Sequence, residues 1–410
     1  MTTAAAPPAP SDSSLPCRHF PNCAGCALIG RPYGTQLAAK RRQVIEALGS
    51  FPALARLDVP PVIGSPRAFG YRNQAKLVVR RTRRGLLLGI YRPGSHQVVD
   101  IRQCPVHHPL VMQAIEAVAR VVERYDIPTY DERSRAGILR YVIIRGSHWT
   151  KTVQVILVTR DRLLPHARNI VRSLLRVRGV RSIVQNINPK PGNAIFGPAF
   201  VPLTHETALI ERIGFVKLKT RAGAFLQANV AVARKLYAHA LQQAALDATG
   251  RAIDLYCGVG GLTFYLATTA KHVAGIEASA IAIADAKENI RLNGFHNVRF
   301  YCGTVAAALP AIAQGLGRLD VMTLNPPRKG VDTSARTAIV RAAPKRIVYI
   351  SCDPGTLARD LDWFAAQGYR PAHLQPFDLL PQTEHVECVA TLEDAREEHR
   401  MPARRPSFRP

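Results

Sequence analysis

A cysteine stands where an apolar, strand-like segment gives way to a helix. Residues 346–350 form the apolar run of a buried strand, and a helix is predicted to begin near Asp353. A thiol at a helix N-terminus lies in a positive electrostatic potential, which favours the thiolate, and the thiolate is the nucleophilic form. Cys352 is therefore a candidate nucleophile, although a cysteine after a strand, taken alone, is more commonly a small buried apolar residue.

A glycine-rich turn follows another strand-like segment. Asp254-Leu-Tyr-Cys-Gly-Val-Gly-Gly261 precedes a predicted helix at 262–267, and its glycines let the backbone turn tightly and approach a ligand closely. Glu277 ends the next predicted strand, where a carboxylate accepts hydrogen bonds from ribose hydroxyls. Together with Asn325-Pro-Pro-Arg328 after the fourth strand, this pattern fits an S-adenosylmethionine-dependent methyltransferase better than a nicotinamide-dependent enzyme.

Four further cysteines have a spacing that suits metal binding: Cys17, Cys23, Cys26 and Cys104. Four thiols can close a tetrahedral zinc site or hold a cubane iron–sulfur cluster, and the spacing alone does not separate the two. The chain shows no export-signal pattern, so its eight cysteines are not expected to form structural disulfides. The other three are expected to be packing residues: Cys257, Cys302 and Cys388.

The chain is strongly basic. Its 410 residues include 55 Lys and Arg against 29 Asp and Glu, a formal net charge of +26. Such a surplus points to a polyanionic partner, with the basic proteome of an arginine-rich organism as the alternative explanation. Arginines cluster at 80–84 and 168–181, which favours a localised electrostatic footprint. No apolar run reaches membrane-spanning length, so we expect a cytoplasmic protein with no membrane partner, and we expect a monomer.

The predicted secondary structure differs between the first and the second part of the chain. The first part of the chain is predicted to be mostly β, with helices at 36–48, 109–125 and 162–176 and strands within 71–99 and at 139–145, 152–159, 182–188 and 211–219. From residue 229 onward helices separate strands predicted at 252–256, 272–276, 298–301, 321–324, 346–350 and 371–377. Such alternation predicts a doubly wound parallel sheet.

We therefore predict an α/β protein with three parts. A class I (Rossmann-like) S-adenosylmethionine methyltransferase domain is preceded by a mixed, mostly antiparallel β domain and an N-terminal Cys-cluster segment. The predicted boundaries are 1–16 for a disordered N-terminal tail, 17–70 for the Cys-cluster segment and helix, 71–225 for a central β-rich RNA-binding region that includes Cys104, 226–393 for the methyltransferase catalytic domain, and 394–410 for a basic C-terminal tail.

Several motifs, taken in order, resemble those of the RNA uracil-5-methyltransferases. They are Gly70-Tyr-Arg-Asn-Gln-Ala-Lys76, Leu88-Gly-Ile-Tyr-Arg-Pro-Gly-Ser-His96, Leu139-Arg140, Phe225-Leu-Gln-Ala-Asn229, Asn325-Pro-Pro-Arg-Lys-Gly330, Ser351-Cys-Asp-Pro-Gly-Thr-Leu-Ala-Arg-Asp360 and Thr383-Glu-His-Val-Glu387. The likeness covers residues 17 to 392, and that many ordered motifs are very specific. It implies methylation of uracil C5 in RNA with S-adenosyl-L-methionine.

The resemblance also implies a covalent mechanism. A thiolate adds to C6 of the uracil, and the resulting enolate attacks the methylsulfonium through C5. Cys352 matches the family's nucleophile. A base then removes the C5 proton so that the thiol can be eliminated, and Glu387 matches that base, with Glu384 as the alternative. His385 is expected to shape the loop.

The same resemblance implies the residues that line the S-adenosylmethionine site: Gln227, Tyr256, Glu277 and Asn325. Many family members have Asp where this chain has Asn325, and the Asn-Pro-Pro-Arg form occurs among the ribosomal RNA enzymes. Members with this cysteine spacing carry a [4Fe–4S] cluster, so the resemblance implies one here, held by Cys17, Cys23, Cys26 and Cys104. It is expected to fasten the N-terminal segment, because methyl transfer requires no electrons.

The expected substrate is a uridine in large-subunit (23S) ribosomal RNA. Some family members begin with a small β-barrel of the TRAM type, which we expect to be absent here because sixteen low-complexity residues precede Cys17. One alternative is a transfer RNA uracil-5-methyltransferase, although members with that substrate typically lack the cysteines. Another is an amino-group methyltransferase of adenine or glutamine, against which Arg328 and Cys352 count. The third is a non-catalytic iron–sulfur RNA-binding protein.

Overall fold

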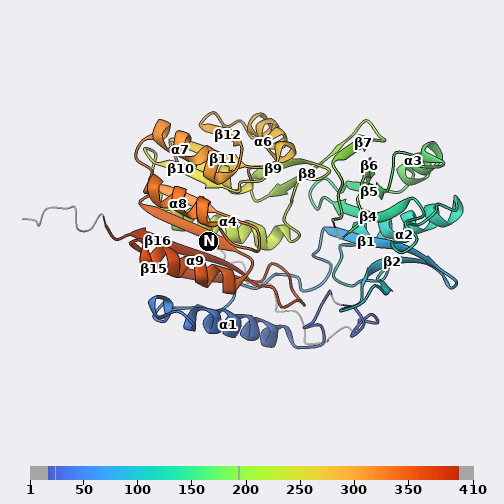
Figure 1. Ribbon diagram of the computed structural model, residues 1–410, viewed down its shortest axis with the longest axis horizontal. Coiled ribbons are helices and arrows are strands. Elements are labelled where there is room, and N and C mark those ends of the chain that lie inside the picture. Colours follow the sequence, from blue (N-terminus) through green and yellow to red (C-terminus); the bar gives the residue numbers. More distant parts are fainter. Residues whose placement is uncertain (1–16, 24, 193, 397–410) are drawn as a thin grey trace, which may run out of the picture.

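Two seven-stranded sheets form the framework of residues 17–23, 25–192 and 194–396, which are the residues that the computed structural model describes (Figure 1). The predicted N-terminal tail, 1–16, and residues 397–410 of the predicted C-terminal tail lie outside the described residues. Within the described ranges, no helix has the length and apolar character needed to cross a membrane. The predicted α/β class is confirmed.

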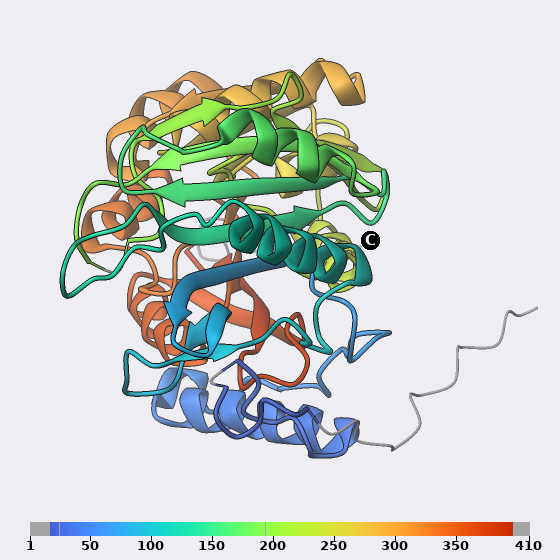
Figure 2. The ribbon, with the colours of Figure 1, turned by 90° about the vertical axis from the view of Figure 1, so that its right-hand side faces the viewer.

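The middle of the chain forms the central sheet. Its elements are β1 (Gln74–Thr82), β2 (Gly85–Tyr91), β3 (Val98–Asp100), α2 (Pro109–Arg124), β4 (Leu139–Gly146), β5 (Val153–Thr159), α3 (Ala167–Leu175), β6 (Val180–Ile187) and β7 (Ala199–Pro202). The strand order is β3-β2-β1-β4-β5-β6-β7. Neighbours are antiparallel except β5 and β6, which run parallel because α3 crosses between them. Helices α2 and α3 lie on the face turned away from the other sheet (Figures 1 and 2).

Strands β4 and β5 are buried along their whole length. On one face, Val142 and Val155 belong to a core that includes α2 and α3. On the other face, Tyr141 and Ile156 lie in a smaller cluster that Phe200 helps to cover. Coverage of both faces explains why the two strands are buried throughout, where burial would alternate along a half-exposed strand.

A separate hairpin, β8 (Ala208–Ile213) and β9 (Val216–Arg221), lies between the two sheets. The sequence predicted a single strand at 211–219, and this prediction was wrong. Gly214 has a φ of 63°, so the chain turns back there. Strand β9 packs against helix α6 (Ala280–Asn293) of the C-terminal half.

The C-terminal half forms the second sheet. Its elements are α4 (Val230–Ala244), β10 (Arg251–Leu255), α5 (Gly261–Ala267), β11 (His272–Glu277), α6, β12 (Val298–Cys302), α7 (Val305–Leu316), β13 (Val321–Leu324), α8 (Thr333–Ala342), β14 (Arg346–Ser351), α9 (Pro354–Ala366), β15 (Tyr369–Phe377) and β16 (Glu387–Asp394). The strand order is β12-β11-β10-β13-β14-β16-β15. Side chains of α4, α5 and α6 pack into one core, and those of α7, α8 and α9 pack into another, so helices cover both faces.

Strand β16 departs from the predicted parallel sheet. It inserts between β14 and β15 and runs antiparallel to both. Strands β15 and β16 are consecutive and are joined by a loop at 378–386, with no crossover helix. Consecutive paired strands joined in this way are antiparallel, which is why the expectation of a wholly parallel sheet was wrong.

Helix α1 (Tyr33–Gly49) lies against α9 of the C-terminal sheet, although it precedes the central sheet in sequence (Figure 1). The buried ammonium group of Lys40 bonds to the carboxylate of Asp378 at 2.5 Å and to the carbonyl oxygen of Leu380 at 3.1 Å. A buried ion pair with a second acceptor holds its partners in one arrangement. The N-terminal helix and the loop at 378–386 are thereby fastened together.

Candidate functional site

The predicted catalytic and cofactor residues gather at one edge of the C-terminal sheet. The parallel strands β10, β11, β13 and β14 all end at this edge. Ligands of doubly wound sheets bind just outside such carboxyl ends. The glycine turn follows β10, Glu277 ends β11, Asn325 follows β13 and Cys352 follows β14. Segments that are far apart in sequence are therefore brought together here.

The turn after β10 has a special backbone. Tyr256 (φ 59°), Gly258 (φ 55°) and Gly260 (φ 92°) all lie in the left-handed region. A Cβ atom at Gly260 would lie 2.7 Å from the ring of Phe300, so both conformation and space require glycine there. A left-handed conformation at a residue other than glycine, as at Tyr256, costs about 1–3 kcal/mol and is concentrated at ligand-binding turns.

Asp254, on β10, stabilises this turn through hydrogen bonds. Its buried carboxylate accepts hydrogen bonds from the hydroxyls of Thr263 and Thr323, both at 2.6 Å. Burial raises the pKa of Asp254 to about 6. The two bonds join β10 to α5 and to β13, so Asp254 positions the turn.

Glu277, at the end of β11, is hydrogen-bonded to the same turn. One carboxylate oxygen accepts a hydrogen bond from the backbone N–H of Gly258 at 3.2 Å, and the other accepts from that of Ser279 at 2.8 Å. The side chain is half-exposed. Each carboxylate oxygen has a second lone pair, so Glu277 can still accept hydrogen bonds from ribose hydroxyls.

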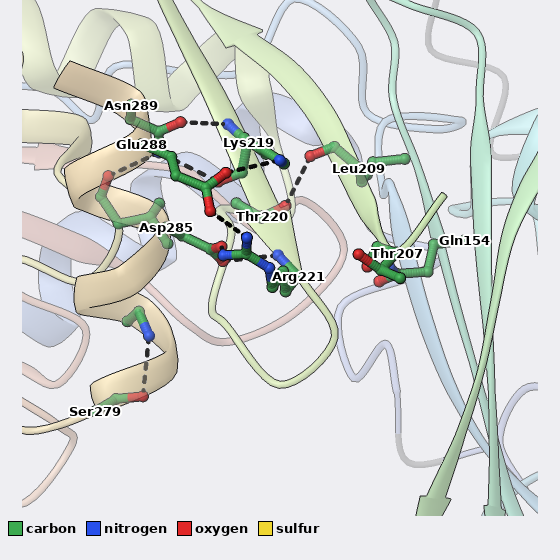
Figure 3. A network of polar contacts seen from close by, with 12 residues as sticks. Gln154, Thr207, Leu209, Lys219, Thr220, Arg221, Ser279, Asp285, Glu288 and Asn289 are labelled. Atoms are coloured by element: carbon green, nitrogen blue, oxygen red, sulfur yellow. Dashed lines mark hydrogen bonds and ion pairs between the residues drawn. The ribbon is translucent and has the colours of Figure 1, made fainter. Parts of the chain in front are cut away.

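Helix α6, which follows Glu277 closely, is tied to the hairpin by the polar network of Figure 3. The backbone N–H of Arg221 donates to Asp285 at 2.7 Å, and its guanidinium pairs with both Asp285 and Glu288. The ammonium group of Lys219 bonds to Glu288 at 2.7 Å. The position of Glu277 therefore depends on the hairpin that lies between the two sheets.

Gln227 and Asn325 approach the turn from two other directions. Gln227 is buried, and its side chain lies near the hydroxyl of Tyr237. The ring of Tyr237 lies against Gly261, because a Cβ atom there would come within 3.0 Å of it. The backbone N–H of Asn325 donates to the carbonyl oxygen of Leu255, at the end of β10, at 3.3 Å. The predicted cofactor residues therefore surround the glycine turn.

Cys352 and Glu387 come from neighbouring antiparallel strands. Ser351, which ends β14, lies opposite Cys388 of β16, so the next residue of each chain segment brings Cys352 beside Glu387. Burial raises the pKa of the Cys352 thiol, and the charge of Glu387 raises it further. Burial also raises the pKa of Glu387 to about 7. The predicted nucleophile and the predicted base are thus close enough to influence each other.

The surroundings of Cys352 differ from the sequence-based expectation. A helix N-terminus was expected to favour its thiolate, but the pKa of the thiol is raised. Asp353 is the N-cap of α9, and its carboxylate accepts a hydrogen bond from the backbone N–H of Thr356 at 2.9 Å. The positive end of the helix is therefore already occupied by an anion. The thiolate depends on a positive charge elsewhere.

Arg328 supplies that charge. It lowers the pKa of Cys352 and that of Glu387, against the larger effect of burial. Its guanidinium lies 3.0 Å from Nε2 of His385. From the sequence, Arg328 served to exclude other methyltransferase classes, and a role beside the thiol was missed. Its place after two prolines at a strand end was the available signal.

The two candidate bases, Glu384 and Glu387, have different surroundings. Glu384 is exposed, and its charge acts on the neighbouring His385. The ring of His385 contacts Arg328, and burial lowers the pKa of His385, so the ring is mainly neutral at pH 7. Glu387 has the desolvated carboxyl group and the position beside Cys352 that a base needs.

The four predicted cluster cysteines gather where the N-terminal segment meets the central sheet. Cys26 is buried, and Cys17 and Cys104 pack in the same apolar cluster as Tyr71. Burial and, to a smaller extent, the charges of Cys104, Cys23 and Cys17 raise the pKa of the Cys26 thiol to about 12. Within the described part of the chain, no group of three or more His, Cys, Asp or Glu side chains is arranged to hold a metal ion.

The remaining cysteines are not alike. Cys257 and Cys388 are buried, as expected of packing residues. Cys302 is exposed, and the expectation that it packs in the core was wrong. The reason is that Cys302 ends β12, which is an edge strand of the sheet.

Comparison with known proteins identifies the family of this chain. A family model described as tRNA (Uracil-5-)-methyltransferase matches residues 210–395. An uncharacterized RNA methyltransferase of Geobacter sulfurreducens is 40% identical to this chain over 377 residues, which are 92% of this chain and 76% of the relative. The chain belongs to the RNA uracil-5-methyltransferase family.

Further comparisons support the activity of the enzyme. An uncharacterized RNA methyltransferase of Halalkalibacterium halodurans is 39% identical over 386 residues, 94% of this chain and 84% of the relative. The crystal structure of Pyrococcus abyssi tRNA (uracil-54, C5)-methyltransferase in complex with S-adenosyl-L-homocysteine has a TM-score of 0.73 and 28% identity, covering 91% of this chain and 86% of that one. The enzyme is an S-adenosylmethionine-dependent RNA uracil-5-methyltransferase. The alternative of a non-catalytic RNA-binding protein was wrong.

Proposed function

We propose that the enzyme methylates C5 of a specific uridine in 23S ribosomal RNA through a covalent bond between Cys352 and C6 of the uracil. The observation that carries this proposal is the position of Cys352 beside Glu387, at the sheet edge that also bears the glycine turn. Family membership gives the reaction, and these two side chains supply a nucleophile and a base for it.

The steps follow from the chemistry of uracil. The thiolate of Cys352 forms a bond to C6, and the electron pair of the C5–C6 double bond moves into an enolate. C5 then attacks the methyl carbon of the sulfonium, and S-adenosyl-L-homocysteine leaves. Glu387 removes the proton from C5, the double bond forms again and the thiolate is expelled. The base must be out of its stack, because C6 and C5 are attacked through a ring face.

The electrostatics of the site suit these steps. With a pKa of about 7, Glu387 is partly ionised at neutral pH, and it is a stronger base than an ordinary carboxylate. Burial disfavours the thiolate of Cys352, whereas the positive charge of Arg328 favours it. An RNA that fills the site and excludes water strengthens this attraction, because the local dielectric constant falls.

The methyl donor is proposed to bind at the glycine turn. Glu277 is placed to accept hydrogen bonds from the ribose hydroxyls, since its carboxylate is fixed by two backbone N–H groups. Gln227, Tyr256 and Asn325 line the rest of the site. Their support is their position around the turn, described above, and the fold shared with a structure that contains S-adenosyl-L-homocysteine.

We also propose a [4Fe–4S] cluster held by Cys17, Cys23, Cys26 and Cys104. Four thiols, the softest ligands in proteins, interact electrostatically with one another, and the backbone N–H of Gly25 points at Sγ of Cys23 at 3.4 Å. When bound, the cluster would fasten the N-terminal segment to the central sheet. Protein purified without oxygen should contain about four irons per chain and absorb broadly in the violet. Stoichiometric zinc without iron would contradict the assignment.

Transfer RNA is the second candidate substrate. It is favoured by the Pyrococcus abyssi structure, whose name gives tRNA uracil-54 as the target. The proposed cluster favours ribosomal RNA, and we propose that the enzyme acts in the cytoplasm. Mapping 5-methyluridine in 23S ribosomal RNA and in transfer RNA, from cells with and without the gene, separates the two. A site lost from 23S RNA supports the proposal, a site lost from transfer RNA reassigns the substrate, and no lost site overturns both.

A further inference from the structure

The two arginine groups of the sequence have different surroundings in the structure. At the end of β1, Arg80 pairs with Asp131 at 2.9 Å and Arg81 pairs with Asp126 at 3.1 Å. These ion pairs neutralise part of the first group locally. Along and after α3, in contrast, no ion pair joins an arginine of the 168–178 segment to a carboxylate within the described residues. The arginines of the second group are therefore not neutralised by ion pairs.

Helix α3 directs its arginines outward. Ile170 and Leu174 are buried against the central sheet. Arg168 and Arg172 stand two residues before these positions, about 200° around a helix of 3.6 residues per turn, and both are exposed. Arg176, at the C-cap, is exposed and continues the row at the same spacing. Arg168, Arg172 and Arg176 are called the α3 arginine row below.

The α3 arginine row has few acidic neighbours in sequence. The segment 162–181 contains no Asp or Glu. Asp161, just before it, pairs with Arg160 at 2.8 Å. On the neighbouring helix α2, Glu116 lines the same hollow as Arg176 without forming an ion pair with it, and the charges of Glu116 and Glu123 also act on Arg102. A row of exposed guanidinium groups that form no ion pair among the described residues fits a polyanion, because each group can bond to a phosphate in a bidentate manner.

The row lies far from the catalytic edge. Helix α3 covers the face of the central sheet that is turned away from the C-terminal sheet, as the two views show (Figures 1 and 2). Cys352 and Glu387 belong to the C-terminal sheet. An RNA whose uridine lies at Cys352 therefore reaches α3 only if it extends well beyond the modified base.

We propose that the α3 arginine row binds phosphates of the RNA substrate at a distance from the modified uridine, and that the natural substrate is accordingly a large folded RNA. This inference rests on the RNA substrate of the proposed function and adds a second contact to it. Phosphate contacts carry no sequence information, so the row anchors and orients the RNA while the catalytic edge selects the base.

The test compares two triple variants of the full chain. One replaces the row, with Arg168→Gln, Arg172→Gln and Arg176→Gln. The control removes the same charge from three exposed arginines on separate helices, with Arg42→Gln, Arg291→Gln and Arg341→Gln. Binding is measured over a range of salt concentrations to two RNAs, a 23S domain fragment and a short hairpin that carries the target uridine.

For the 23S fragment, the row variant should bind more weakly, and its slope of log affinity against log salt should be less steep by about 2–3, since each lost phosphate contact removes about 0.9. Its affinity for the hairpin, and the control variant with both RNAs, should match wild type. Wild-type behaviour of the row variant with the fragment overturns the inference, as does an equal loss in the control or with the hairpin. Methyl transfer to the hairpin tests the proposed function separately, because the row does not contact that RNA.

Discussion

The polar side chains described for the two sheets differ in whether they have bonding partners. At the edge of the C-terminal sheet, Asp254 is bonded to two threonine hydroxyls and Glu277 to two backbone N–H groups. On the outer side of the central sheet, the α3 arginine row is exposed and has no carboxylate partner among the described residues. We therefore propose that a few fixed side chains carry out the reaction, whereas several interchangeable arginines supply affinity for RNA.

This difference follows from the two physical tasks. A general base acts only within hydrogen-bond reach of the proton that it removes, so its position must be fixed. Attraction between guanidinium groups and phosphates acts over a Debye length of about 8 Å at physiological salt, and it tolerates movement. Single substitutions should therefore have large effects at the C-terminal edge and small effects on α3.

The largest effect is expected for Cys352→Ala. Without the thiol, C5 of uracil is not activated, and methyl transfer should fall by about 10⁴-fold or more. Binding of S-adenosyl-L-methionine, measured by calorimetry, should stay near wild type because the thiol acts on the base. Cys302→Ala, at an exposed cysteine, is the matched control and should remain active. Substantial turnover by Cys352→Ala would refute the covalent mechanism.

Glu387→Gln should lose turnover at a later step. The variant can still form the bond from Cys352 to C6 and transfer the methyl group, but it cannot remove the C5 proton, so turnover should fall by about 10²–10⁴-fold. A covalent enzyme–RNA adduct should then accumulate as a slowly migrating band in denaturing electrophoresis. Glu384→Gln is the control, and it should turn over normally. The reverse pattern would move the base to Glu384.

A smaller effect is expected from pH. Glu387 must be ionised to accept the proton, and its pKa is about 7. Below that value the ionised fraction, and with it the rate of adduct breakdown, should fall about tenfold for each pH unit, and above it the rate should level off. Adduct decay after a single turnover, followed by rapid quenching, gives this rate apart from the thiol addition step. Breakdown that is unchanged between pH 5 and 8 would exclude Glu387 as the base.

The smallest effect is expected for a single substitution in the α3 arginine row. Arg172→Gln removes one phosphate contact, so the salt slope for a 23S fragment should change by about 0.9 and methyl transfer to a hairpin should not change. Filter binding at several salt concentrations measures this slope. A loss of affinity as severe as that of the triple variant would show that the row acts as one fixed site, and the contrast between the two sheets would then fail.

Apolar strands were predictable from sequence, because a buried strand leaves a local signal. The strand at 321–324 was predicted with its observed bounds, and the strand that ends at Glu277 and the strand that precedes Cys352 were each placed within one residue. The hairpin at 208–221 was misread as one strand because Gly214 interrupts the alternation of apolar and polar residues too briefly to be recognised.

Long-range effects were not predictable from local pattern. The sequence predicts a helix that begins near Asp353, and Asp353 is its N-cap, but the sequence does not show that Glu387 lies across the sheet from the thiol. The direction of the pKa of Cys352 follows from these neighbours and from burial. The role of Arg328 was missed for the same reason, since it depends on segments that meet only in the folded sheet.

The pairing of Lys40 with Asp378 also determines when the enzyme can form during synthesis. The two residues are 338 positions apart, and Gln36 exchanges hydrogen bonds with Gln382 across 346 positions. The ribosome releases helix α1 first, so its ammonium group stays without this carboxylate until the chain is almost complete. Under the proposed mechanism, a chain that stopped after Cys352 would carry the nucleophile without the base, Glu387. Helix α1 packs against α9 and bonds to Asp378, which both follow Cys352, so a chain that stopped there would lack the contacts that hold α1 in place.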